Sequence, residues 1–275
     1  MPELPEVETV VRGLRPLLIG RTVLSARYDW PGSLVTPDGP CFVARIAGQP
    51  VRDLYRRGKY ILIALDPDTL IIHLKMTGRL YVVPDESVHD ADRWVHFTFQ
   101  LDNGQQLRFS DARKFGRVYL VDDPQTVIGA LGPEPLDESF SLDLFRARLR
   151  ERSGRLKPLL LDQTFLAGLG NIYADEALWT SQLHPLRPAN TLSDDDLSRL
   201  YHAIRDVLRS GIIREGASVN WYRKPDGAKG SAQDTLSVYG RAGLPCLRCG
   251  HPVTRIVVGG RGTHLCPACQ VWELA

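Results

Sequence analysis

The chain has 275 residues, which exceeds the usual size of one domain and predicts two. Its apolar content of 43% and charged content of 24% are those of a soluble globular protein, and no apolar run approaches the ~18 residues of a membrane span. The formal net charge of +2 argues against a uniformly basic coat, but basic residues cluster at 56–59, 113–117 and 223–224, which suits either a polyanion groove or a solvated surface.

The sequence begins Met1-Pro2-Glu3, and this stretch can carry covalent chemistry. Removal of Met1 would leave Pro2 with a free secondary amine, which forms an iminium (a Schiff base) when it attacks a sugar aldehyde carbon. A free α-amino group has a pKa of about 7.7–8.0, so a fraction of it is unprotonated near neutral pH. Glu3 is placed to carry the protons. The alternative interpretation is an ordinary loose terminus.

Residues 5–19 are predicted to form an amphipathic helix, because apolar residues recur at helical spacing and Gly20 suits its end. Pro16 is a defect in this pattern and predicts a kinked or non-helical last turn. A buried helix at this place would hold the terminus still, which a catalytic Pro2 requires.

From residue 21 to about 121 the pattern is that of short strands, rich in β-branched and aromatic residues and separated by turn residues. Strands are expected at 60–65, 70–76, 79–83, 94–101, 106–110 and 117–121. Closely spaced strands without intervening helices favour antiparallel sheets, hence a sandwich or a barrel.

Two features of this strand-rich region can contact nucleic acid. Lys59 lies in a basic turn and can serve as a general acid or a phosphate clamp, although plain surface charge is the commoner role for a lysine. Met76, Arg113 and Phe115 lie on two turns, and apolar side chains with an arginine among them suit a wedge that opens a duplex. Core packing is the alternative for the methionine and the phenylalanine.

Residues 132–135 have the composition of a linker, and the pattern beyond them is helical. Helices are expected at about 141–152, 155–162, 171–182 and 193–210. Ser193 is the predicted cap of the last helix. Residues 223–235 have no apolar period and are expected to form a loop.

A Gly-x-Gly sequence, the glycine step, precedes the helix expected at 171–182. Gly168 and Gly170 allow backbone N–H groups to approach a phosphate at the helix start, and Asn171 can donate a further bond; Lys157 comes shortly before. A single Gly-x-Gly is weak evidence, and it lacks the preceding strand that dinucleotide binding requires.

Four cysteines form the strongest pattern of the chain. Two Cys-x-x-Cys pairs separated by a hairpin-sized segment predict one tetrahedral zinc ion, held by Cys246, Cys249, Cys266 and Cys269. Four thiolates leave no open position, so this zinc is structural. Arg261 is expected at the hairpin tip, where an arginine can reach a phosphate or remain solvated. A metal pattern in place of disulfides predicts a reducing cytoplasm.

Five segments together resemble one family. They are residues 1–9, the Lys59 turn, residues 111–116, residues 170–174, and residues 238–241 leading into the cysteine module. In this order, from residue 1 to about 270, they are similar to the bacterial formamidopyrimidine-DNA glycosylases.

The resemblance implies an α+β fold: a two-layered antiparallel β-sandwich with an N-terminal helix, then a helical domain with a helix–two-turn–helix motif and a four-cysteine zinc finger, with DNA in the cleft between the domains. The expected parts are a catalytic sandwich at 1–131, a linker and first helix at 132–150, the DNA-binding helical region at 151–222, a mobile loop beside the lesion pocket at 223–239, and the zinc finger at 240–275.

The family also implies an activity: excision of oxidised purines such as 8-oxoguanine and formamidopyrimidines from duplex DNA, then strand cleavage at the abasic site by β,δ-elimination. It implies a flipped damaged base, since the sugar carbon is out of reach inside the stack. The implied catalytic residues are Pro2, Glu3, Lys59 and Arg261. The implied DNA contacts are Met76, Arg113 and Phe115, which fill the gap left by the flipped base, and Lys157, Asn171 and Arg261, which grip phosphates.

Three departures from the family pattern leave the lesion preference open. Residues 215–218 do not contain the expected glycine pair, Trp221 stands where the family often has an aspartate, and residues 230–232 lack the usual aromatic. An endonuclease VIII-like enzyme for oxidised pyrimidines is therefore the close alternative, and a non-catalytic protein that binds damaged DNA is the alternative of another class. A monomer without membrane association is expected.

Overall fold

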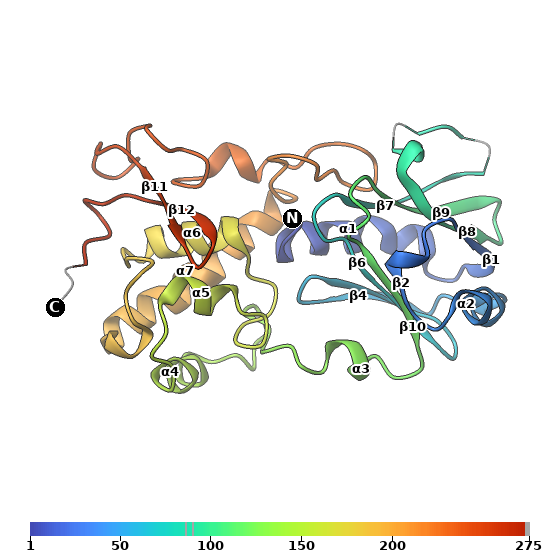
Figure 1. The fold of residues 1–275 in the computed structure, drawn as a ribbon, viewed down its shortest axis with the longest axis horizontal. Coiled ribbons are helices and arrows are strands. Elements are labelled where there is room, and N and C mark those ends of the chain that lie inside the picture. Colours follow the sequence, from blue (N-terminus) through green and yellow to red (C-terminus); the bar gives the residue numbers. More distant parts are fainter. Residues whose placement is uncertain (86, 90, 273–275) are drawn as a thin grey trace. The chain divides into compact units, whose positions relative to one another are not determined.

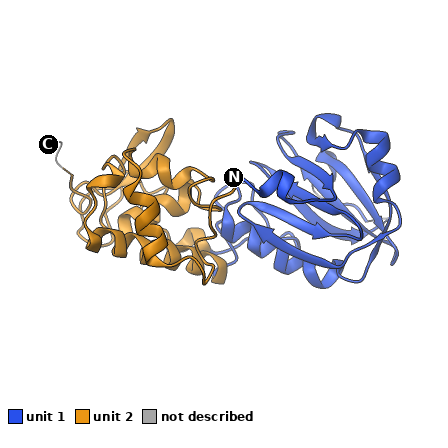
Figure 2. Cartoon of the chain, turned by 90° about the horizontal axis from the view of Figure 1, so that it is seen from below, with its two compact units in different colours: residues 1–130, 214–231 blue, residues 131–213, 232–275 orange. Residues whose placement is uncertain are grey.

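The computed structural model describes residues 1–85, 87–89 and 91–272. The chain divides into two compact units, which Figure 2 colours separately. Unit 1 consists of residues 1–130 and 214–231, and unit 2 of residues 131–213 and 232–275. The segment 214–231 therefore packs with the N-terminal part of the chain. The five-part division drawn from the sequence stays a prediction, because the two units report only which segments pack together.

Unit 1 is a two-layered β-sandwich with a long N-terminal helix (Figure 1), as predicted. Its helices are α1 (Leu4–Leu18), α2 (Gly39–Ile46) and α3 (Gln125–Ile128), with 3₁₀ helices η1 (Pro31–Ser33) and η2 (Asp92–Trp94). Its strands are β1 (Thr22–Tyr28), β2 (Leu34–Thr36), β3 (Gln49–Pro50), β4 (Asp53–Arg57), β5 (Tyr60–Ala64), β6 (Thr69–His73), β7 (Gly78–Pro84), β8 (Val95–Leu101), β9 (Gln105–Asp111) and β10 (Arg117–Val121).

The ten strands form two sheets of five. One has the order β3-β1-β8-β9-β7 and the other β2-β10-β6-β5-β4. The pairs are antiparallel except that β2 runs parallel to β10 at a sheet edge. The strands predicted after residue 60 are present with bounds shifted by a few residues. Four more strands and α2 lie before it, where no individual element is predicted, because β1 buries its residues irregularly and β3 has two residues.

Helix α1 packs on β4, β5 and β7 and contributes one face to the core of unit 1. Leu4, Val7, Leu14 and Leu18 are fully buried, and they belong to this core or begin the helix that covers it. The last turn is not non-helical, since α1 continues through Pro16 to Leu18; a kink there stays a prediction. Pro16 removes only one helical hydrogen bond, and the carbonyl it leaves belongs to a solvent-exposed turn of the helix.

Unit 2 is mainly helical. Its helices are α4 (Leu142–Arg150), α5 (Leu156–Leu161), α6 (Asn171–Thr180) and α7 (Asp194–Ile213), with 3₁₀ helices η3 (Ala189–Thr191) and η4 (Ala232–Thr235) and a hairpin of β11 (Thr254–Val258) and β12 (Arg261–Leu265). Ser193 caps α7 as predicted: its Oγ accepts the Asp196 N–H at 3.1 Å, and the Asp196 carboxylate accepts the Ser193 N–H at 3.1 Å.

Helices α6 and α7 pack closely because α7 carries a glycine at their contact. A Cβ at Gly211 would lie 2.6 Å from the ring of Tyr173 on α6, so a larger residue would push the helices apart. Within the described part of the chain, no helix combines the length and apolar character needed to cross a membrane.

Candidate functional site

The N-terminal end of α1 is buried. Pro2 is buried and precedes Glu3, the N-cap, whose side chain is 2% exposed. Glu3 and Glu6 form a capping box, in which the Glu3 backbone N–H donates to Glu6 Oε2 at 2.8 Å. The terminus is thus fixed by hydrogen bonds and packing, so the interpretation of a loose end does not hold for this structure.

Glu6 makes a second contact that the sequence analysis missed. Its other oxygen, Oε1, accepts the backbone N–H of Ala217 at 2.7 Å, and the side chain is 1% exposed. One buried carboxylate therefore joins the first turn of α1 to the segment 214–231. The capping-box spacing from Glu3 to Glu6 was a signal for the local bond, but a bond to a residue so distant in sequence has no local signature.

Burial at the terminus favours the neutral form of the terminal amine. Burial lowers the pKa of the α-amino group of Met1, and the charges of Lys59 and Arg113 lower it further, against the opposing effect of Glu3 and Glu6. Once Met1 is removed, the amine belongs to Pro2, which is itself buried. Burial of an amine at that position disfavours its protonated form.

Lys59 lies in the turn between β4 and β5 and is 4% exposed. Gly58 before it has φ of 56°, a left-handed conformation that glycine adopts readily and that lets the chain turn back tightly between the two strands. His73, paired with Tyr60 across β5 and β6, is also in range of this charge. Burial, with the charges of Lys75 and Lys59, lowers the His73 pKa to about 3, so the imidazole there is neutral.

Met76, Arg113 and Phe115 are brought to one place by Asp111, another residue whose role the sequence did not reveal. Its buried carboxylate accepts the Thr77 hydroxyl and the Gly116 N–H, the latter at 2.6 Å. The turn after β6 and the turn after β9 are therefore tied together.

The three side chains themselves lie at the surface. Met76 is 39% and Phe115 46% exposed, and the Arg113 guanidinium lies 4.6 Å from the centre of the Phe115 ring. Exposed apolar groups held on a rigid base have the form of a wedge. Core packing is therefore not their role in this structure.

In unit 2, two side chains hold the tip of the zinc-module hairpin. Lys157 Nζ donates to the Gly262 carbonyl at 3.2 Å, and Asn171 Nδ2 donates to the same oxygen at 3.0 Å. Arg261 is adjacent and exposed. Gly259 and Gly260 both have positive φ, as a tight two-residue hairpin turn requires. The two polar residues thus fix the backbone that carries Arg261.

Lys157 is fully buried, and its charge is balanced by Asp175, also fully buried, at 2.5 Å. The second oxygen of Asp175 accepts the backbone N–H of His264 on β12 at 2.8 Å. A direct phosphate contact by Lys157 stays a prediction. The contacts in place make Lys157 and Asp175 a support for the hairpin.

The four cysteines converge as the spacing predicts. The Sγ atoms of Cys246, Cys249, Cys266 and Cys269 all lie within 4.8 Å of one another. Four thiolates at this spacing fit a tetrahedral zinc ion. Cys246 Sγ also accepts the Trp179 indole N–H at 3.3 Å, an outer hydrogen bond of the kind that stabilises a thiolate ligand. Zinc bound here would tie the module to α6, since Trp179 packs against the cysteine cluster.

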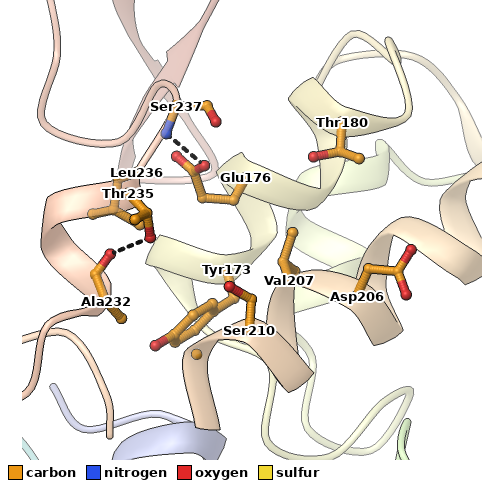
Figure 3. A pocket seen from close by; sticks show the side chains of 11 residues that line it. Tyr173, Glu176, Thr180, Asp206, Val207, Ser210, Ala232, Thr235, Leu236 and Ser237 are labelled. Carbon is orange, nitrogen blue, oxygen red and sulfur yellow. Dashed lines mark hydrogen bonds between the residues drawn. The ribbon is translucent and has the colours of Figure 1, made fainter. Parts of the chain in front are cut away.

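A cavity of about 240 Å³ lies between α6, α7 and the segment after η4. Figure 3 shows Glu176 reaching from α6 to the backbone of Ser237. The carboxylate accepts the N–H groups of Ser237, Val238 and Tyr239 at 2.8–2.9 Å. Burial raises the Glu176 pKa although these bonds oppose it. Glu176 therefore anchors the bent segment 237–239 that leads into the zinc module, and the sequence analysis missed it.

Comparison with known proteins accounts for nearly the whole chain. Residues 1–118 match the formamidopyrimidine-DNA glycosylase N-terminal domain, residues 131–222 the formamidopyrimidine-DNA glycosylase H2TH domain, and residues 243–271 the zinc finger found in FPG and IleRS. The expected α+β fold and the four-cysteine zinc site are confirmed.

Individual relatives agree with the family matches. A formamidopyrimidine-DNA glycosylase of Herpetosiphon aurantiacus is 49% identical over 276 residues, covering 98% of this chain and 100% of the relative. The Lactococcus lactis FPG (MutM) in complex with a Fapy-dG-containing DNA is similar with a TM-score of 0.90 and 36% identity, over 98% and 100% of the two chains. The Lactococcus lactis Fpg with abasic DNA gives a TM-score of 0.89 and 36% identity, over 98% and 99%.

The buried pair in unit 2 gives a first prediction. Lys157→Met alone should destabilise the fold by about 3–5 kcal/mol, because it leaves the Asp175 charge buried and unpaired. Adding Asp175→Asn should restore most of that stability in urea unfolding, since both charges are then gone and Asn can still accept the His264 N–H. A double variant that stays as unstable as the single one would show that the pair is not the support described.

The cysteine cluster gives a second prediction. Cys249→Ser should lower zinc affinity by more than the roughly 10–100-fold expected for loss of an outer-shell partner, because it removes a ligand. Zinc content and duplex DNA affinity should fall together, whereas Cys41→Ser, at the cysteine outside the cluster, should change neither. Unchanged DNA affinity in a zinc-depleted Cys249→Ser protein would remove the module from DNA binding.

Proposed function

The chain belongs to the formamidopyrimidine-DNA glycosylase family, and from that premise we propose that it removes oxidised purines from DNA and then cleaves the strand at the abasic site. The observation that carries the mechanism is the buried Pro2, which precedes Glu3, whose N–H is held by the carboxylate of Glu6; burial at this terminus favours a neutral amine. The enzyme is a DNA glycosylase of base-excision repair, and its partner is damaged duplex DNA.

Pro2 is the proposed nucleophile. After loss of Met1, its nitrogen attacks C1′ of the damaged nucleotide, the glycosidic bond breaks, and the base leaves with a proton. The sugar then opens to an iminium joined to Pro2. This cation accepts electrons from the C2′–H bond, so the C2′ proton is lost and the 3′ phosphate leaves by β-elimination; loss of the C4′ proton then lets the 5′ phosphate leave by δ-elimination. Water finally hydrolyses the iminium and releases the amine.

Glu3 is the proposed proton carrier for these steps. It lies next to Pro2 and is buried, so its carboxylate moves protons without competition from bulk water. Lys59 is proposed to contact a phosphate beside the lesion. Its positive charge also lowers the pKa of the terminal amine, which keeps the nucleophile neutral.

The DNA contacts are proposed in two groups, one in each unit. In unit 1, Met76, Arg113 and Phe115 fill the space left by the flipped nucleotide, because they are exposed and held on the base formed by Asp111. In unit 2, Asn171 and Arg261 grip phosphates, and Lys157 contributes through the Gly262 carbonyl that it holds. Arg261 is proposed in addition to assist catalysis at the phosphate next to the lesion.

Zinc supplies only structure, since four thiolates fill its coordination. We propose that the protein acts as a monomer in the bacterial cytoplasm, where a reducing environment keeps its cysteines available for metal. An endonuclease VIII-like preference for oxidised pyrimidines is the second candidate, and the departures at residues 215–218 and Trp221 favour testing it.

The mechanism predicts separable effects at the terminus. Pro2→Gly should sharply weaken borohydride trapping on duplexes with 8-oxoguanine, because glycine offers a less nucleophilic primary amine. Glu3→Gln should suppress excision of the intact base. Trapping and cleavage are read on denaturing gels with Met1-free protein. Failure of that protein to form an adduct with any oxidised or abasic duplex would refute the enzymatic function.

The charges around the amine predict a pH dependence. Trapping should rise with pH until the amine is neutral and level off below the ordinary α-amino pKa of about 8, because burial and Lys59 lower that pKa. Lys59→Met removes a positive charge, so the rise should move to higher pH, whereas Lys59→Arg should leave it in place. If trapping by Lys59→Met rises over the same pH range as trapping by the wild-type protein, the Lys59 charge does not affect the pKa of the amine.

A further inference from the structure

Two tryptophans that the mechanism does not use lie together on unit 1. Trp94 in η2 and Trp221 in the segment 214–231 meet edge to face, with ring centres 5.5 Å apart. The Arg93 guanidinium lies 3.6 Å from the centre of the Trp94 ring. Trp221 is 47% exposed, although an indole of this size usually buries most of its surface. The Trp221 indole is therefore exposed to solvent and is packed against a second aromatic ring, which itself contacts a cation.

The part of the segment 214–231 that carries Trp221, which we call the tip, is held in place by hydrogen bonds and by burial of a neighbouring residue. Tyr222, the next residue, is buried in the core of unit 1, and its hydroxyl donates to the Glu215 carbonyl at 3.1 Å. The Gly230 N–H donates to Ser218 Oγ at 3.0 Å, and the Ser231 N–H donates to the Arg214 carbonyl at 2.8 Å, so the segment closes on itself. The exposed indole is presented on an anchored loop.

The same segment begins at the proposed catalytic end. Ala217 is hydrogen-bonded to Glu6, whose other oxygen holds the N–H of Glu3. Trp221 follows four residues later, which places it within about 14 Å of Ala217 even if the chain were fully extended. A nucleotide drawn out of the duplex toward Pro2 thus comes within reach of the indole.

The charged side chains of this region suit binding to DNA. Arg93 and Lys229 are exposed, and Arg223 is half-buried. The acidic Glu215 and Asp226 are paired with Lys224, at 3.0 and 3.5 Å. Aromatic faces among cations bind nucleobases by stacking, and the stacking needs no particular hydrogen-bond pattern.

We propose that Trp221, backed by Trp94 and Arg93, is a stacking platform for the extruded damaged base, and that it selects planar oxidised bases over ring-saturated ones. This proposal rests on the proposed function. A flat ring such as 8-oxoguanine covers the indole face, whereas a saturated pyrimidine is puckered and cannot. Trp221 is thereby a specificity-determining residue of this chain, and Trp94 a positioning residue.

The test compares three duplexes, which carry 8-oxoguanine, a preformed abasic site or 5,6-dihydrothymine. With Met1-free protein, Trp221→Ala should lower single-turnover excision of 8-oxoguanine by roughly tenfold or more, as expected for loss of one base–aromatic stack. Cleavage of a preformed abasic site should stay at the wild-type rate, because that substrate has no base to stack. Trp221→Phe should recover part of the loss, and Trp94→Ala should show a smaller loss of the same kind. Excision of 5,6-dihydrothymine should be insensitive to Trp221→Ala.

Val219→Ala is the matched control. Val219 is 42% exposed on the same tip, so this variant should leave both rates unchanged. Equal losses on 8-oxoguanine and on the abasic site would make Trp221 a general support for DNA binding or folding and overturn the platform. A wild-type rate of Trp221→Ala on 8-oxoguanine would overturn it as well. If wild-type protein cleaves neither the 8-oxoguanine duplex nor the abasic one, the proposed function itself fails, and that outcome is distinct from both.

Discussion

The structure of unit 1 depends on one buried carboxylate. Glu6 accepts the Glu3 N–H with one oxygen and the Ala217 N–H with the other, and it is nearly inaccessible to solvent. A buried carboxylate is unfavourable by several kcal/mol unless its oxygens are hydrogen-bonded, so these two bonds are required and not incidental. They fix the proposed catalytic terminus and the beginning of the segment 214–231 to the same group. The proposed nucleophile and the proposed base platform are consequently parts of one arrangement.

Buried carboxylates also fix the backbone at the other places where the chain carries residues proposed to act on DNA or to bind zinc. Asp111 joins the two turns that present Met76 and Phe115, Asp175 fixes the zinc-module hairpin through His264, and Glu176 fixes the segment that leads into that module. Each carboxylate is buried and accepts backbone N–H groups. Met76, Arg113, Phe115 and Arg261, which are proposed to meet DNA, are exposed, whereas the acids that hold their turns and hairpin are buried.

Much of this could be predicted from local patterns. The helical period of α1, the strands after residue 60, the Ser193 cap and the cysteine spacing are signals within short windows, and the structure contains what they indicate. The strands before residue 58 are irregular and gave no such signal. Pro16 indicated a disrupted last turn, but the single hydrogen bond that it removes lies on a solvent-exposed turn, so the helix continues. The buried acids were missed for a different reason: Glu6, Asp111 and Asp175 act through partners that only the folded chain brings near. Lys157 shows the same limit, because its spacing before the glycine step gave no sign that its charge is buried against Asp175.

The central claim is that Pro2, freed of Met1, is the group that attacks the sugar. The most direct measurement is peptide mapping by mass spectrometry of the protein cross-linked to abasic DNA with borohydride. The account predicts that the sugar remnant lies on the N-terminal peptide, on a chain that begins at Pro2, and that protein retaining Met1 carries no adduct. A remnant on Lys59, or an adduct formed equally well by protein that keeps Met1, would contradict it.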